Sequence, residues 1–148
     1  MRWAQIVGAT VGVIAVATLS GCEKPPPSVT VWSGTGSVNE AAQCWSFESA
    51  NLGPDQCAAD ILQGNRATGV PTLPITSGNT VGISVDNEVA AAGWTPIVGG
   101  QKVLEQPITD TYFRFTMPLV GPEQPIPLQI VAGKDANIRG VWIFQLQP

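Results

Sequence analysis

The sequence predicts an all-β domain over residues 28–148, an antiparallel immunoglobulin-like β-sandwich of about seven strands. Short segments in which apolar and polar residues alternate recur along this part of the chain, and a period of two is typical of strands that bury one face. Glycines and prolines, 16 and 13 in number, separate these segments, and only one segment has a helical pattern. A closed barrel with a similar number of strands would produce the same pattern.

Residues 1–21 are predicted to be a lipoprotein signal peptide. Arg2 precedes an apolar run that ends at Leu19-Ser20-Gly21-Cys22. In such a signal, the peptidase cuts before the cysteine once its thiol carries a diacylglycerol, so we expect Cys22 to be lipidated. An uncleaved N-terminal anchor is the alternative. Both interpretations place the domain outside the cytoplasmic membrane.

Residues 22–27 are predicted to be the lipidated cysteine and a proline-rich tether. The three consecutive prolines at 25–27 favour extended polyproline II, at about 3.1 Å per residue. A diacylglycerol together with an amide-linked acyl chain is enough for stable anchoring. The expected location is therefore the extracytoplasmic face of the cell membrane, with membrane lipid held through acylated Cys22.

The sequence contains three cysteines, and assigning Cys22 to lipid leaves Cys44 and Cys57 as a pair. In an oxidising compartment the natural expectation is a disulfide bond. Closing a loop of this size would stabilise the fold by roughly 3 kcal/mol in the chain-entropy model. A buried thiol pair and a metal site are the alternatives, and a metal site would need ligands other than histidine, which the sequence lacks.

In the first half of the domain only one strand has a clear pattern. Residues 28–33 alternate valines with Thr30 and Trp32, and a glycine turn follows at 34–36. Cys44 could lie on a further strand, and residues 56–62 fit either a short helix or an irregular segment. Residues 64–78 contain two prolines and fit a loop or an edge segment.

The second half has clearer patterns. A helical turn is expected over residues 88–92, and Gly99-Gly100 predicts a tight hairpin turn. A further turn is expected over residues 133–137. Six segments are expected to be extended: residues 81–85, 94–98, 101–104, 111–117, 126–130 and 142–146.

The aromatic residues are the best candidates for binding. Four of the five tryptophans remain after Trp3 leaves with the signal, and exposed tryptophans can stack on sugar rings or anchor a partner, although filling the core is their commoner role. Trp94 is the candidate for exposure because it follows Gly93 at a break between elements. Tyr112 and Arg114 share one strand face and could line a contact patch, or simply a solvated face.

Composition argues against most catalytic chemistry. The chain has no histidine, so the commonest general base, metal ligand and triad member is missing, and we expect no enzyme activity, no cofactor and no metal. Asp86-Asn87-Glu88 offers oxygen ligands for calcium but lacks the spacing of a calcium loop, which favours a solvated turn. The formal net charge of −4 disfavours nucleic acid as a partner.

Several motifs together resemble a known family. They are the lipobox, the cysteine pair, the run Val81-Gly82-Ile83-Ser84-Val85-Asp86 with Gly93-Trp94, the Thr111-Tyr112 pair, and Gly140-Val141-Trp142. The chain thereby resembles an actinobacterial lipoprotein family known as domain of unknown function twenty-seven seventy-one, over nearly the whole mature chain. The resemblance implies a lipid-anchored envelope protein. It implies no activity or substrate, and no functional residue beyond Cys22.

The expected function is that of a non-enzymatic interaction or structural module in the cell envelope. Its expected partner is an envelope protein or a cell-wall glycan. The alternative is an extracytoplasmic lipoprotein that binds a small ligand or a glycan through exposed tryptophans.

Overall fold

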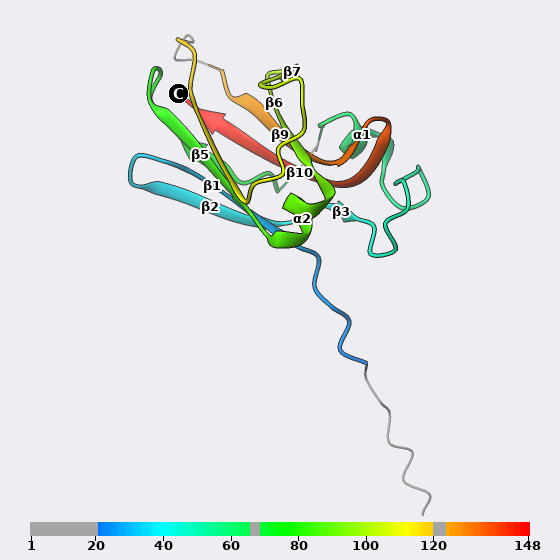
Figure 1. Cartoon of the computed structure of the whole chain (residues 1–148). Helices are drawn as coiled ribbons and strands as arrows, with labels where there is room; N and C mark the ends of the chain where they lie inside the picture. The colour runs from blue at the N-terminus through cyan, green and yellow to red at the C-terminus, as the bar shows by residue number, and fades with distance from the viewer. Residues whose placement is uncertain (1–20, 66–68, 120–123) are drawn as a thin grey trace, which may run out of the picture.

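The computed structural model describes residues 21–65, 69–119 and 124–148. The predicted signal peptide therefore lies outside the described residues except for Gly21. The domain is mostly β, with two sheets that face one another (Figure 1). Within the described ranges, no helix is both long enough and apolar enough to cross a membrane.

The first sheet has four strands in the order β2-β1-β5-β8, and all neighbours are antiparallel. β1 and β2 form a hairpin, in which Gly34 adopts a positive φ of 58° that favours glycine. The strands of this sheet are β1 (Ser28–Ser33), β2 (Gly36–Ala41), β5 (Thr80–Val85) and β8 (Tyr112–Thr116).

The second sheet has six strands, five of them in the order β3-β10-β9-β6-β7. The sixth, β4, pairs in parallel with the C-terminal end of β10, whereas all other pairs are antiparallel. The strands are β3 (Cys44–Trp45), β4 (Thr72–Pro74), β6 (Trp94–Val98), β7 (Gln101–Lys102), β9 (Ile126–Lys134) and β10 (Asn137–Gln147). Two short helices complete the fold, α1 (Ala59–Leu62) and α2 (Asn87–Ala92).

The main core lies between the two sheets. Alternate residues of each long strand point inward, because successive side chains of a strand point to opposite faces. The largest fully buried side chains are Trp94, Trp142, Phe144, Leu73, Ile83 and Met117. This arrangement of two sheets around one core is consistent with the predicted β-sandwich.

A second, smaller core covers the outer face of the six-stranded sheet. Cys44 and Cys57 form a disulfide bond, as predicted, with their Cα atoms 5.6 Å apart, and Leu52 packs against them. Val141 and Ile143 of β10 are also buried, at 0% and 2% exposed. Because Cys44 pairs with Val141 in the sheet, the disulfide holds the following loop onto this outer face and does not connect the two sheets.

The structure has more strands than the predicted seven or so. The additional strands are β2, β3 and β4. β3 and β4 are only two or three residues long, too short to produce a recognisable alternation, and β2 is an edge strand with no buried residue. The return strand expected over residues 101–104 is correspondingly only two residues long, and α2 begins at Asn87, one residue earlier than expected.

The last two strands are longer than predicted, so the turn expected over residues 133–137 is wrong in extent. β9 continues to Lys134 and β10 begins at Asn137. Glycine at 133 suggested an early turn, but the ladder absorbs the irregularity through a register shift between Ile138 and Gly140.

Candidate functional site

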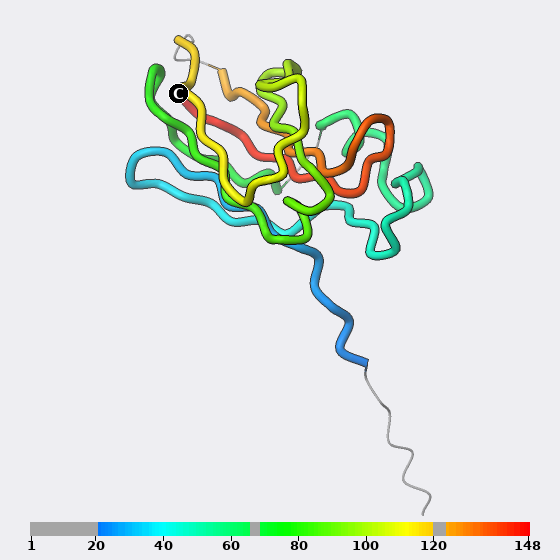
Figure 2. Tube along the Cα trace, in the orientation of Figure 1, coloured from blue at the N-terminus to red at the C-terminus, as the bar shows by residue number. Residues whose placement is uncertain are grey.

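The tether leaves the domain beside α2 (Figure 1 and Figure 2), and several contacts hold its last residues. The backbone N–H of Ser28 donates a 2.7 Å hydrogen bond to the Asp86 carboxylate, and Lys24 forms an ion pair with Glu88. The Pro27 carbonyl accepts hydrogen bonds from the Ala42 N–H, at 3.0 Å, and from the Trp142 indole, at 3.2 Å. These contacts determine where the tether leaves the domain.

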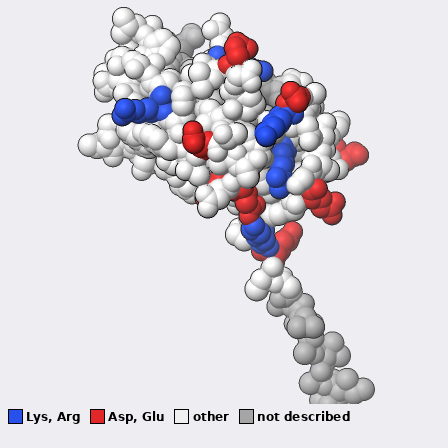
Figure 3. Space-filling view, viewed as in Figure 1, with Lys and Arg blue, Asp and Glu red and all other residues white. Residues whose placement is uncertain are grey.

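Cys22 lies beyond these contacts, where its thiol is free and exposed. The carboxylates of Asp86 and Glu88 face the tether, so they act as structural contacts at this end of the domain. Among the described residues no group of three or more Asp, Glu, His or Cys side chains is arranged to hold a metal ion. Figure 3 shows one face of the molecule, on which carboxylates gather where the tether joins the domain and other charges are scattered.

Trp94 is buried, so its assignment as an exposed binding residue is wrong. The side chain is 0% exposed, and its indole N–H donates a 2.9 Å hydrogen bond to the Asp110 carbonyl. The ring also meets Phe113 edge to face, with 6.5 Å between ring centroids. Gly93 ends α2, and Trp94 is the first residue of β6, where its side chain points into the core. The local sequence pattern does not reveal this inward orientation.

Tyr112 and Arg114 are both exposed on the outer face of β8, where sequence analysis placed them together. Tyr112 is 43% exposed and lies parallel to Trp32, with 6.4 Å between ring centroids and 7° between ring planes. Phe113 and Phe115 occupy the opposite, inner face and pack against the main core. The predicted division of this strand into two faces is therefore correct.

Trp32 lies flat on the outer face of the four-stranded sheet. Its cross-strand neighbour is Gly82, whose neighbour on the other side is Arg114. A Cβ atom on Gly82 would lie only 2.1 Å from the indole Cε2, so the glycine leaves room for the ring to rest on the strand. We call the surface formed by Trp32, Gly82, Tyr112 and Arg114 the aromatic platform.

Polar side chains surround the aromatic platform. The strand register places on the same outer face a set of residues with hydroxyl or amide groups, namely Thr30, Ser37, Asn39, Thr80, Ser84 and Thr116. The Asn39 amide donates a 2.8 Å hydrogen bond to the Thr30 hydroxyl. The platform is therefore a flat aromatic surface with hydrogen-bonding groups around it.

Sequence analysis counted Trp32 among the four candidate tryptophans but singled out Trp94 for exposure in its place. The signal was present, because Trp32 alternates with buried valines and shares its face with Thr30. Its flat position, however, depends on Gly82 in another strand, and the pairing of these strands is not visible in the local pattern.

The other tryptophans belong to the interior. Trp142 is 0% exposed, and Trp45 packs against it with 5.9 Å between ring centroids. The Arg139 guanidinium lies over the Trp45 ring, with its central carbon 4.7 Å from the ring centroid. These two tryptophans therefore close the end of the core near the tether.

The described residues thus define a two-sheet β domain with an aromatic outer face. No protein-family model, curated protein or solved structure matches the chain at a significant level.

Proposed function

We propose that the chain is a lipoprotein of the cell envelope, anchored through acylated Cys22 to the extracytoplasmic face of the membrane, and that its domain is a non-enzymatic binding module. The lipobox sequence and the exposed thiol at the free end of the tether support this proposal. Two facing, mostly antiparallel sheets are compatible with an immunoglobulin-like β-sandwich and with the actinobacterial family that the sequence resembles. The immunoglobulin-like fold and the membership of that family are both part of the proposal.

The tether sets the orientation of the anchored domain. Its six residues span at most about 19 Å at 3.1 Å each in polyproline II. The end of the domain near α2 would then face the bilayer, and carboxylates such as Glu88 would be repelled by anionic headgroups. The aromatic platform lies on a side face of the domain and would stay accessible to envelope components.

The anchor is tested by the intact mass of the protein extracted from membranes. Cleavage before Cys22 together with the mass of the acyl chains is the expected result. A full-length mass without acyl chains would contradict the anchor.

A specific observation favours a glycan as the partner of the platform. Trp32 and Tyr112 present nearly parallel rings at the surface, and the apolar face of a sugar ring stacks on such aromatic surfaces. The surrounding hydroxyl and amide groups can exchange hydrogen bonds with the sugar hydroxyls. Arg114 adds a cationic donor at the edge, which suits a glycan that carries carboxylates.

Co-sedimentation with insoluble cell-wall glycan tests this second proposal. Trp32→Ala and Tyr112→Ala should each weaken binding about tenfold or more, because each removes a ring that stacks on the sugar. Phe47→Ala is the matched control, since Phe47 is 48% exposed in the loop after β3 and lies outside the platform. Equal binding by all variants would exclude the platform as the glycan site.

If the protein does not co-sediment with the glycan, site-specific crosslinking from position 112 tests whether the platform binds another protein. Crosslinks to one envelope protein that Trp32→Ala abolishes would support a protein partner in place of the glycan. The absence of any specific crosslink would contradict a binding role for this face.

A further inference from the structure

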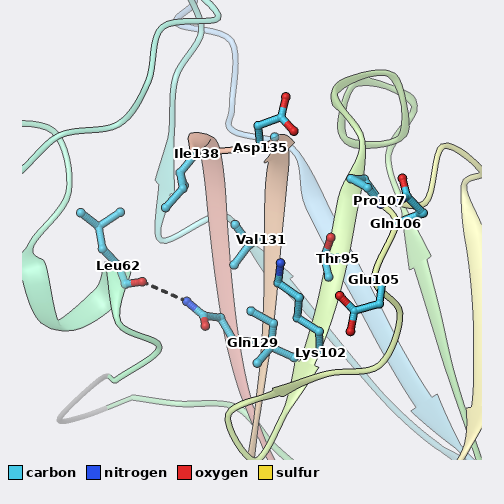
Figure 4. Close-up of a pocket in the computed structure, with 12 residues that line it drawn as sticks. Leu62, Thr95, Lys102, Glu105, Gln106, Pro107, Gln129, Val131, Asp135 and Ile138 are labelled. Carbon is cyan, nitrogen blue, oxygen red and sulfur yellow. Dashed lines mark hydrogen bonds between the residues drawn. The ribbon is translucent and has the colours of Figure 1, made fainter.

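A cavity of about 340 Å³ lies on the outer face of the six-stranded sheet (Figure 4). The aromatic platform lies on the other sheet. The strand register determines its floor: Thr95 pairs with Val131, Ile97 pairs with Gln129, and Lys102 pairs with Ile97. All five side chains point to the outer face. Leu62, at the end of the short helix α1 that follows the disulfide, forms one wall of the cavity. The segment after β7 forms the other wall.

Two floor side chains are polar and almost completely buried. Thr95 is 9% exposed and Gln129 is 8% exposed. The Gln129 amide nitrogen donates a 3.3 Å hydrogen bond to the Leu62 carbonyl, and the amide oxygen accepts no hydrogen bond from the described residues. Within residues 21–65, 69–119 and 124–148, the Thr95 hydroxyl has no hydrogen-bond partner either. Neither atom is among the fully buried polar atoms that lack a partner in the described residues, so both reach solvent in the cavity and are available to a ligand that enters it.

Charges of opposite sign stand at one side of the cavity. Figure 4 shows the Lys102 ammonium extending over the floor and the Glu105 carboxylate pointing into the cavity from the adjacent wall. Neither group forms a salt bridge with another residue in the described part of the chain. A second carboxylate, Asp135, lines the cavity at its far end, so a purely anionic ligand would meet repulsion.

The opposite wall is apolar. Leu62 and Ile138 line it, and Val131 continues it on the floor. The volume lies at the low end of the range of about 300–1,000 Å³ that is usual for small-molecule sites. A small ligand that carries both charges at one end and is aliphatic at the other would match this lining.

We propose that this cavity binds an α-amino acid with an aliphatic side chain. Lys102 pairs with the ligand carboxylate and Glu105 with its ammonium, while Leu62 and Ile138 contact the side chain. The Gln129 amide oxygen accepts a hydrogen bond from the ligand ammonium, and the Thr95 hydroxyl donates one to the ligand carboxylate. The site is separate from the aromatic platform, so neither proposal depends on the other.

Isothermal titration calorimetry on the full protein, extracted from membranes into detergent micelles, tests the site with leucine as the probe. Leucine should bind, whereas N-acetyl-leucine, which lacks the ammonium, and leucinamide, which lacks the carboxylate, should each bind at least tenfold more weakly. Glucose, an uncharged ligand of similar size, should not compete. Equal binding of leucine and its two analogues, or displacement by glucose, would overturn the assignment of the ligand class.

Variants locate the binding. Lys102→Gln should weaken leucine binding about tenfold or more, and Thr95→Val, which removes the hydroxyl but keeps the shape, several-fold. Lys24→Gln is the matched control, because it removes one exposed cation from the tether, which does not line the cavity, and should leave binding unchanged. An unaltered thermal melting curve for each variant shows that it is folded. The absence of a binding signal at millimolar leucine, or binding unaffected by Lys102→Gln and Thr95→Val, would overturn the proposal.

Discussion

The indole of Trp32 rests on the backbone of Gly82 in the neighbouring strand, in space that any other residue at position 82 would fill with its Cβ atom. The pair explains how a large aromatic ring lies flat on a sheet face and remains partly exposed. It also aligns the ring with Tyr112 on the next strand but one. The aromatic platform therefore depends on a glycine as much as on its aromatic residues.

Gly82→Ala should displace the indole and destabilise the domain by about 1–3 kcal/mol, because an added methyl group in an occupied space forces the ring or the strand to move. Chemical denaturation measures the change, and intrinsic fluorescence reports the new environment of Trp32. In the background Trp32→Ala the same glycine substitution should cost much less, since the clash is absent. A similar cost in both backgrounds would argue against the contact.

Trp94→Phe should destabilise the domain by about 1–3 kcal/mol. The substitution removes part of a fully buried ring and leaves the Asp110 carbonyl without its indole donor. Denaturant unfolding gives the free energy, and Trp32→Phe, at a partly exposed site, is the comparison. If both substitutions cost the same, the burial of Trp94 is contradicted.

Cys44→Ala and Cys57→Ala should each lower stability by a similar amount, about 3 kcal/mol, because either removes the same bridge over a separation of 13 residues. The double substitution should cost little more than either one. Melting temperatures under non-reducing conditions provide the measurement. Unequal single effects would show that one thiol has a separate role.

Cys22→Ser should move the protein from the membrane fraction to the soluble fraction without changing its melting temperature. The exposed thiol contributes nothing to the packing of the domain, whereas its acyl chains would supply the membrane affinity. Cell fractionation with immunodetection measures the distribution. Retention of the serine variant in the membrane would contradict anchoring through this residue.

Lys24 and Glu88 form the one salt bridge found among the described residues, and it should contribute little to stability. Both side chains are substantially exposed, at 66% and 37%, so solvent screens the pair. Glu88→Gln should change the unfolding free energy by less than about 1 kcal/mol. Asp86→Asn, which weakens the hydrogen bond to the Ser28 N–H, should cost more. The reverse order would show that the ion pair, and not the backbone contact, holds the tether.

The sequence alone determined the mostly β class of the domain and one covalent link. The alternation of Val29 and Val31 with polar neighbours, and of Tyr112 with Phe113, reflects a physical constraint that is local: successive side chains of a strand point to opposite faces. The cysteine pair could be predicted similarly, because the signal pattern suggests export and the remaining thiols would then be expected to oxidise.

The tertiary structure alone decided which faces are exposed and which residues meet. A period of two shows that one face of a strand is buried, but it does not reveal the partner strand or the register, so Trp94 was singled out for exposure and Trp32 was not. The same holds for the cavity, where Lys102, Thr95 and Gln129 converge only because β7, β6 and β9 are adjacent. Contacts between distant segments arise from the free energy of packing the whole chain, which no local pattern contains.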